Sequence, residues 1–392
     1  MSPRRRELGG GPPACVIGDT DVIRPLGLAG VRTACVAQPD WAPARSRFSS
    51  ERIGWEDSWE RPEALLRNLL AFAERQPRPA PLFVQQDRDL LFCSRNRDAL
   101  DGAFRLVLAD AETIEGCVDK ASFGALAEGL GLPVPRSVAL RPREGSAPPD
   151  LPLEFPLVVK PVTRREALWR PHGAGRKALE LGSQRELGAA WPGLVRIGMD
   201  LVAQELVPGA EDRIESYHAY VDEGGETAAE FTGRKLRTLP IRFGETTALE
   251  ITDAGDVREL GRECTRALGL RGVAKLDFKR APSGALRLLE VNPRFTLWHH
   301  PGALAGVNIP AIVYADLVGL PRPSAARARP GVTWSMPWKD YRAARAEGMP
   351  PLRWAHWQAR CDAWHVIAAD DPMPFLATIL WPRIKRPLRP RS

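Results

Sequence analysis

The 392-residue sequence lacks the features that mark several common classes of protein. No apolar run reaches the 18 or more residues of a transmembrane helix, and no signal-peptide apolar region follows the basic N-terminus. None of the six cysteines lies in a CxxC pair, which argues against a zinc site and favours buried thiols in a reducing compartment. We therefore expect a cytoplasmic protein with no transmembrane segment.

Motifs of other functional classes are also missing. There is no GxGxxG to suggest a dinucleotide, and no Ser/His/Asp or Cys/His constellation for nucleophilic catalysis. The formal net charge of +7 is spread along the chain apart from its two ends, which fits an anionic small ligand, a solvated surface or a codon bias toward arginine. A nucleic-acid partner is not expected, because no basic stripe with interleaved aromatic residues is present.

The side chains best suited to chemistry lie in a predicted β-hairpin over residues 273–295. Polar and apolar residues alternate along its first strand, and residues two apart on a strand share a face. One face would carry Asp277, Glu290 and Asn292, with Arg294 just beyond the strand. Oxygen ligands beside a guanidinium suit a hard cation held on phosphates. The alternative is an ion-paired surface hairpin, but the apolar neighbours of Glu290 favour a functional carboxylate.

The chain opens with a strand–helix–strand pattern over residues 14–37, which predicts a parallel sheet. The turn at Gly18 would then lie at the edge where open α/β sheets bind ligands, although a tight turn without a ligand is an equal alternative. A helix is predicted over 61–74 and a strand over 81–85, with Asp87 at the same edge of the sheet.

Two lysines in the middle of the chain are placed for phosphate binding. Asp119 is a predicted N-cap, so Lys120 lies in the first helical turn, where the dipole disfavours a cation unless an anion is bound. Lys160 ends a buried strand and is followed by a basic loop with Gly173 and Gly175, whose backbone can close on phosphates. Each lysine alone is more often a surface residue, so the prediction depends on their order.

Residues 321–392 form a Trp-rich, basic C-terminal extension that carries no motif we can assign. It holds half of the twelve tryptophans, and five of its last ten residues are Lys or Arg. This end is suited to contact an anionic membrane surface, although a solvated basic tail is the simpler interpretation.

Taken in order, these pieces resemble the ATP-grasp superfamily over about residues 14–320, and particularly its carboxylate–amine ligases, the group that includes the D-aspartate ligases. The resemblance implies an α/β and α+β fold with a parallel-sheet domain first, then a small α/β lid and a larger part with an antiparallel sheet, and with ATP between the last two. The implied boundaries are a disordered N-terminus (1–12), a preATP-grasp α/β domain (13–112), an N-terminal ATP-grasp part with a glycine-loop lid (113–203), a C-terminal ATP-grasp part with the metal site (204–320) and the extension (321–392).

The resemblance also implies roles for individual residues. Those that bind the nucleotide are Lys120, Lys160, Gly173 and Gly175 at the phosphates, Gln204, Glu205, Leu206 and Val207 at the adenine, and Glu211 (or its neighbour Asp212) at the ribose. The metal ligands are Asp277, Glu290 and Asn292. The catalytic residues are Arg294, which would steady the reacting phosphate or acyl phosphate, and the basic pair Arg234 and Lys235 near the γ-phosphate.

The implied activity is an ATP-dependent ligase that activates a carboxylate as an acyl phosphate and joins it to an amine, on an amino acid or peptide. ATP and Mg²⁺ would be required, with two metal ions and Mn²⁺ as an alternative. The partners would be small-molecule carboxylates and amines, and a homodimer is compatible with the family. Two alternatives are an ATP-binding regulatory or assembly module without ligation, and an ATP-grasp small-molecule kinase.

Overall fold

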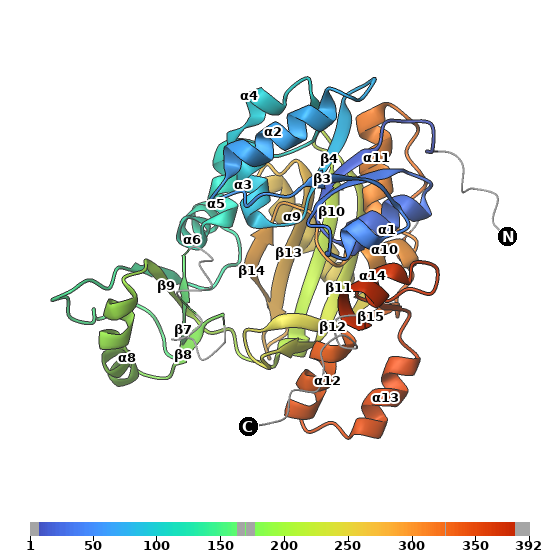
Figure 1. The fold of residues 1–392 in the computed structure, drawn as a ribbon. Helices are drawn as coiled ribbons and strands as arrows, with labels where there is room; N and C mark the ends of the chain where they lie inside the picture. The colour runs from blue at the N-terminus through green and yellow to red at the C-terminus, as the bar shows by residue number, and fades with distance from the viewer. Residues whose placement is uncertain (1–7, 163–168, 170–176, 326, 381–392) are drawn as a thin grey trace, which may run out of the picture.

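The computed structural model describes residues 8–162, 169, 177–325 and 327–380, and its strands form three sheets (Figure 1). The N-terminal sheet is parallel, with the spatial order β3-β2-β1-β4-β5. Its strands are β1 (Ala14–Ile17), β2 (Thr33–Ala37), β3 (Ser49–Gly54), β4 (Ala80–Val84) and β5 (Phe104–Arg105). Its helices are α1 (Thr20–Leu28), α2 (Pro62–Ala73), α3 (Asp87–Arg95) and α4 (Arg97–Leu100). The predicted strand–helix–strand opening is confirmed.

A smaller antiparallel sheet forms a lobe beside the rest of the molecule (Figure 1). Two helices lead to it, α5 (Ala111–Val118) and α6 (Lys120–Gly129). The sheet has the order β6-β9-β7-β8, with strands β6 (Ser137–Leu140), β7 (Leu157–Pro161), β8 (Leu179–Leu181) and β9 (Leu201–Glu205). Helix α8 (Gln184–Ile197) covers it and buries Leu187, Trp191 and Leu194 in the core of the lobe.

The largest sheet has seven strands in the order β14-β13-β10-β11-β12-β15-β16. They are β10 (Ile214–Val221), β11 (Thr227–Leu239), β12 (Glu245–Thr252), β13 (Gly272–Arg280), β14 (Leu286–Asn292), β15 (Thr333–Ser335) and β16 (Ala363–Trp364). Its helices are α9 (Gly255–Ala267), α10 (His299–Leu304) and α11 (Ile309–Val318). Strands β13 and β14 are the predicted hairpin, with the predicted turn between them.

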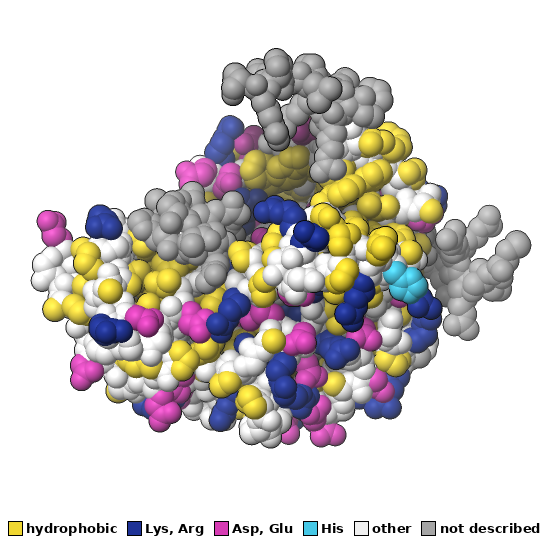
Figure 2. Space-filling model, turned by 90° about the horizontal axis from the view of Figure 1, so that it is seen from below, with side chains coloured by type: hydrophobic (Ala, Val, Ile, Leu, Met, Phe, Trp, Pro, Cys, Tyr) yellow, Lys and Arg dark blue, Asp and Glu magenta, His cyan; other side chains and the backbone are white. Residues whose placement is uncertain are grey.

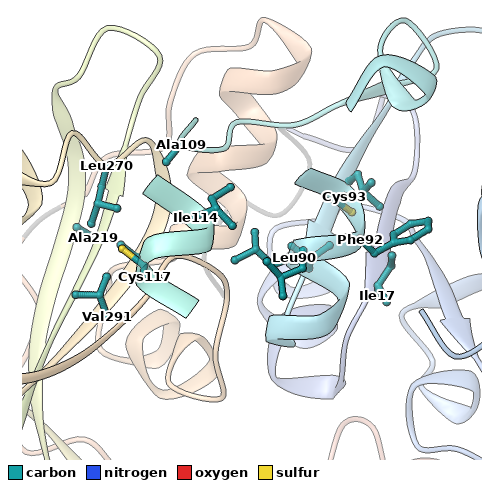
Figure 3. Close-up of a cluster of buried hydrophobic side chains, with 14 of the residues drawn as sticks. Ile17, Leu90, Phe92, Cys93, Ala109, Ile114, Cys117, Ala219, Leu270 and Val291 are labelled. Carbon is teal, nitrogen blue, oxygen red and sulfur yellow. The ribbon is translucent and has the colours of Figure 1, made fainter. Parts of the chain in front are cut away.

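One hydrophobic core joins the parallel sheet to the seven-stranded sheet (Figure 3). On the parallel-sheet side, Leu90 and Phe92 of α3 lie close to Ile17 of β1. On the other side, Ile114 and Cys117 of α5 face residues of the seven-stranded sheet. Because the same buried cluster contains side chains of both sheets, the edge of the parallel sheet is held in a defined position against the β13–β14 hairpin.

The C-terminal extension is built into the seven-stranded sheet. Its two short strands, β15 and β16, add to the edge of that sheet through β12, so the predicted boundary at residue 321 does not separate an independent unit. It also contributes helices α12 (Pro337–Ala346), α13 (Pro351–Ala359) and α14 (Met373–Phe375). Apolar side chains gather over these helices on the lower face of the molecule (Figure 2); the exposed ones include Trp338, Tyr341 and Leu352.

Two of the sequence predictions concern the N-terminal residues and the glycines after Lys160. The disordered N-terminus was predicted over residues 1–12, but Leu8 is buried and the Tyr314 hydroxyl donates to the Pro12 carbonyl at 2.7 Å, so the prediction is wrong for residues 8–12. Gly173 and Gly175 lie outside the described residues. Within the part of the chain that is described, no helix has the length and apolar character needed to cross a membrane.

Candidate nucleotide and metal site

A cavity lies between the four-stranded lobe and the seven-stranded sheet, and side chains from both line it. The lobe contributes Lys120, Lys160, Gln204 and Glu205, and the connection after β9 contributes Leu206, Val207 and Glu211. The opposite wall carries Lys235, Asp277, Lys279 and Glu290. The structure therefore brings the lobe residues predicted to bind the nucleotide close to Lys235, Asp277 and Glu290, which were predicted for the γ-phosphate and the metal.

Both predicted phosphate lysines lie at the β7 side of the cavity. The Asp119 carboxylate caps α6 by accepting from the Ala121 and Ser122 amides at 3.0 and 2.8 Å, which fixes the start of the helix. The Lys120 Nζ then donates to the carbonyl of Pro161 at 3.3 Å. Lys160, one residue earlier on β7, donates to the Gln204 Oε1 on β9 at 2.9 Å. Lys160 and Pro161 are neighbours on β7, so Lys160 and the Lys120 ammonium that binds Pro161 lie at the same part of this strand.

The connection after β9 links the two walls of the cavity. Its backbone is held on the lobe, where the Leu206 amide donates to the Pro156 carbonyl at 3.0 Å. The Glu205 carboxylate is turned toward the same support, because it accepts from the Glu154 amide at 3.0 Å. Glu211 lines the cavity, whereas Asp212 borders a different surface depression, so of these two neighbours only Glu211 lies at the cavity.

The β13–β14 hairpin presents an acid pair, Asp277 and Glu290, which are directly opposite each other across the strand ladder. The Asp277 carboxylate is buried and accepts from the Lys275 Nζ at 2.5 Å and from the Lys235 Nζ at 3.1 Å. The Ser216 hydroxyl on β10 donates to its other oxygen. Three side chains, one each from β10, β11 and β13, therefore converge on this one carboxylate.

The protonation of this cluster follows from burial and from the lysines. Burial alone would raise the pKa of Asp277, but the Lys235 and Lys275 ammonium groups outweigh it and hold that pKa below its ordinary value. Burial lowers the pKa of Lys275, and Asp277 only partly compensates. For Lys235 the opposing effect of burial is smaller than the attraction of Asp277 and Glu290, so its pKa is raised. The Asp277 carboxylate is thus ionised at neutral pH.

The hairpin residues fit a hard divalent cation. Asp277 and Glu290 offer carboxylate oxygens, and Asn292 offers an amide oxygen two residues along the same strand face. The Asn292 Nδ2 donates to the Glu290 Oε1 at 3.3 Å, which places this side chain beside the acid pair. Among the described residues, no group of three or more His, Cys, Asp and Glu is arranged to hold a metal ion, so a metal here would rely on this mixed acid and amide set and on the nucleotide itself.

Arg294 connects the hairpin to the parallel sheet. One of its terminal nitrogens donates to the Asn292 Oδ1 at 3.0 Å, and the other donates to the Gln85 carbonyl at 3.0 Å. Its Nε pairs with the Asp87 carboxylate. Gln85 and Asp87 closely follow β4, so this guanidinium lies where the carboxyl edge of the parallel sheet meets the β13–β14 hairpin.

The predicted basic pair of Arg234 and Lys235 is separated by the alternation of β11. Lys235 faces the cavity and the acid pair. Arg234 lies on the other face of the strand, where its guanidinium pairs with Glu250 at 2.9 Å and borders the same outer depression as Asp212. The structure therefore does not bring Arg234 to the site, because consecutive residues of a strand point to opposite faces.

Four residues at or beside the site were given no role by the sequence analysis. Lys275 and Lys279 share the face of β13 that carries Asp277, and Lys279 pairs with Glu211 at 3.6 Å inside the cavity. The alternation that identified Asp277 applies equally to both lysines and was the signal available for them. Trp169 and Lys177 also line the cavity, and they lie in the basic loop that follows Lys160.

Comparisons with known proteins agree on the fold. A family model described as "ATP-grasp in the biosynthetic pathway with Ter operon" matches residues 224–336. D-aspartate ligase from Enterococcus faecium is 24% identical over 233 residues, covering 57% of this chain and 55% of the relative. The L-amino acid ligase from Bacillus licheniformis is similar with a TM-score of 0.61 at 17% identity, covering 82% of this chain and 78% of that chain.

A second similar solved structure is the biotin carboxylase domain of the 2-oxoglutarate carboxylase from Hydrogenobacter thermophilus, in complex with MgADP. Its TM-score is 0.60 at 14% identity, covering 82% of this chain and 72% of that chain. The parallel-sheet domain, the smaller lobe and the larger sheet agree with the predicted ATP-grasp fold, and a cavity lined by several lysines lies between the lobe and the larger sheet. The chain accordingly has the ATP-grasp fold, its residues 224–336 match an ATP-grasp family model, and it is similar to carboxylate–amine ligases. It spans about half the length of the D-aspartate ligase that it matches.

Proposed function

We propose that this protein is an ATP-dependent ligase that joins a carboxylate to an amine. The observation that carries the proposal is the continuity of the site. A cavity with two lysines for phosphates on one wall and an acid pair on the other is connected through Arg294 to the carboxyl edge of a parallel sheet. Open α/β sheets bind ligands at that edge, so the reacting carboxylate and the nucleotide would meet at Arg294.

The reaction follows from what such a site can stabilise. A carboxylate oxygen of the substrate attacks the γ-phosphorus of ATP, the bond from that phosphorus to the bridging oxygen breaks, and ADP leaves. The amine substrate, with its nitrogen unprotonated, then attacks the carbonyl carbon of the acyl phosphate. Inorganic phosphate leaves with the electron pair of the C–O bond, and the nitrogen loses one proton as the amide forms. No protein nucleophile is needed, so the site works by positioning and electrostatics.

The role that we propose for each residue follows from its position in the site. Lys120 and Lys160 would hold the phosphates from the lobe, and Lys235 and Lys275 would balance negative charge from the opposite wall. Arg294 would bind the acyl phosphate, since its planar fork suits a phosphate and its contacts already fix its orientation.

We propose Mg²⁺ as the metal, held by Asp277, Glu290 and Asn292. When bound, it would supply positive charge against the phosphate oxygens during transfer. The same oxygen-ligand set is suited to Mn²⁺, and whether one or two ions bind is part of the proposal. Glu211 would serve the ribose, and the segment from Gln204 to Val207 the adenine, since all of them line the same cavity.

The partners that we propose are a small carboxylate and a small amine. A basic C-terminus that contacts an anionic membrane, and a homodimer, both stay predictions. The nucleotide-binding cavity alone would also serve a kinase or a binding module, so the products of the reaction must decide.

The test is incubation of the purified protein with ATP, Mg²⁺ and pooled acids and amines, followed by mass spectrometry of the products. An amide whose formation releases ADP and phosphate in equal amounts supports the proposal. A phosphorylated alcohol would instead identify a kinase. Glu290→Gln is the matched control, because it removes one charged ligand of the acid pair while keeping the shape of the side chain.

A further inference from the structure

The carboxyl edge of the parallel sheet carries an aromatic wall that the proposed chemistry does not use. It consists of Trp41, Trp55 and Arg88. The ring centroids of Trp41 and Trp55 are 4.9 Å apart, and the Arg88 guanidinium lies 5.4 Å from the Trp55 ring centroid. Trp41 leaves 37% of its surface exposed, so a large apolar face is open at this edge.

All three residues follow carboxyl ends of strands in the same parallel sheet. Trp55 comes directly after β3, Trp41 lies in the connection after β2, and Arg88 is in the first turn of α3, shortly after β4. Since parallel strands end at one edge, the three side chains are brought there by topology as well as by contact. The strand order reverses between β1 and β4, and a crevice at such a switch point is where open α/β sheets bind small molecules.

This wall is linked to the β13–β14 hairpin through Asp87 and Arg294. Asp87, the neighbour of Arg88 on α3, pairs with Arg294, and Arg294 in turn donates to Asn292. A molecule held against Trp41 would therefore extend along this edge toward the group that we assign to the acyl phosphate. At the same edge, the Gln85 side chain is fixed by its Oε1, which accepts from the Asp19 amide at 2.6 Å.

The charge of Arg88 is already balanced. Its guanidinium pairs with Asp57 at 3.0 Å and lies 3.7 Å from the buried Asp89. A balanced guanidinium stacked on an indole contributes a flat surface and little net charge, so the wall favours a planar ring over a second anionic group. Offset or edge contacts with a second ring are the arrangement that aromatic side chains prefer.

We propose that Trp41, Trp55 and Arg88 form a specificity subsite for the side chain of the carboxylate substrate, and that this side chain is an aromatic ring. The inference deepens the proposed ligase function and rests on it for the identity of the substrate. It assigns Trp41 the direct contact with the ring, because Trp41 is the open end of the wall. Trp55 and Arg88 hold Trp41 in place.

The experiment measures binding without turnover, so that it does not depend on ligation. The protein is saturated with Mg²⁺ and a non-hydrolysable ATP analogue, and titrated calorimetrically with two matched pairs: phenylalanine with alanine, and 3-phenylpropanoate with propanoate. We expect the aromatic member of at least one pair to bind about tenfold more tightly than its aliphatic partner. Equal affinities within both pairs would overturn the proposal.

Three variants test the assignment to Trp41. Trp41→Ala should remove the preference while leaving the affinity for the ATP analogue unchanged, and Trp41→Phe should retain most of it. Trp338→Ala is the matched control, because Trp338 is also exposed but lies on α12, outside the parallel sheet (Figure 1). A preference that persists in Trp41→Ala would overturn the proposal. Phosphate release is measured separately, so aromatic binding without any phosphate release would contradict the ligase and still support the subsite.

Discussion

At the scale of single residues, the site depends on which face of a strand each side chain occupies. Arg234 and Lys235 are consecutive and both basic, yet only Lys235 reaches Asp277, at 3.1 Å. Arg234 is half exposed and pairs with Glu250 on the other face. The two residues therefore form a natural matched pair for mutagenesis.

We expect Lys235→Ala to lower kcat/KM for ATP by about 100-fold, because it removes a preorganised cation from the phosphate side of the site. Arg234→Ala should stay within about twofold of wild type, since an exposed ion pair contributes little. Steady-state rates of ADP formation measure both variants. Equal losses in the two variants would mean that Lys235 has no special role.

Arg294→Ala should spare ATP binding and abolish turnover, because the guanidinium lies beside the metal-ligand hairpin and does not line the nucleotide cavity. Arg294→Lys should recover little activity, since an ammonium cannot make the several directed contacts of the guanidinium. Titration with ATP and single-turnover assays separate the two effects. Substantial turnover in Arg294→Ala would show that the acyl phosphate is stabilised elsewhere.

Some parts of the site follow from local sequence patterns, whereas the contacts of Arg294 do not. Alternation along residues 273–295 was enough to predict the hairpin and the shared face of Asp277 and Glu290, because strand periodicity is local. The contacts of Arg294 with Asp87 and Gln85 span 207 and 209 positions in the chain, and no local pattern encodes them. The same alternation would have placed Arg234 and Lys235 on opposite faces had it been applied to β11.

At the scale of secondary-structure elements, the C-terminal extension connects the seven-stranded sheet to the parallel-sheet domain. We call this connection, made by β15, β16 and Asp371, the clasp. Its strands β15 and β16 extend the seven-stranded sheet. A few residues later, Asp371 reaches α1 and pairs with Arg24 at 3.2 Å, and both side chains are almost completely buried. The Asp371 carboxylate also accepts from the Ser46 hydroxyl and from the Arg47 amide, each at 2.8 Å.

This clasp leads to a prediction for stability. Asp371→Ala should lower the free energy of unfolding by about 3–5 kcal/mol, because it leaves the Arg24 guanidinium buried without its counter-ion. Asp370→Ala is the neighbouring control, and since Asp370 is exposed we expect a change within about 0.5 kcal/mol. Urea unfolding monitored by tryptophan fluorescence compares the variants. Similar midpoints for both variants would show that the clasp contributes no stability.

The sequence could not predict this clasp. Its linker-like composition, rich in proline and arginine around residues 319–333, correctly indicates a connection but also suggested a boundary. The two strands beyond that boundary, β15 and β16, have three and two residues, too few for an alternation pattern to be recognised. Their pairing with β12 is a tertiary contact, and so is the insertion of Asp371 beside α1.

At the scale of the whole molecule, buried histidines couple stability to pH. Burial lowers the pKa of His299 and of His300 to about 4, below the ordinary value near 6.5. Their contribution to stability is therefore present above about pH 6.5 and is lost as the pH falls toward 4. For His365, burial would lower the pKa, but Asp21 raises it above its ordinary value, so its contribution is present at low pH and is lost as the pH rises.

We expect the free energy of unfolding to fall between pH 7.5 and pH 5.5. His299 and His300 would each lose about 1 kcal/mol over this range, and His365 would offset part of that loss. His365→Gln should therefore lose more stability on acidification than the wild type. Urea titrations at the two pH values test this. A stability that is unchanged or higher at pH 5.5 would contradict the assignment of neutral, buried imidazoles.

The fold of the whole molecule was predictable because its order of elements and motifs resembles one superfamily over most of the chain. The packing of the parallel-sheet edge against the β13–β14 hairpin was not predictable, because it depends on the shared core that includes α3 and α5. That arrangement also supports the proposed ligase function, because it places the carboxyl edge of the parallel sheet beside the hairpin whose Asp277 and Glu290 line the cavity.

The most direct test of the central claim is the stoichiometry of the reaction. Purified protein is given ATP, Mg²⁺, one acid and one amine from a productive pool, and ADP, phosphate and the new product are quantified together. We predict one ADP and one phosphate for each amide, a rate that falls to background when either the acid or the amine is omitted, and a loss of at least about 100-fold in Glu290→Gln. ADP formation that proceeds equally without acid and amine would contradict the account.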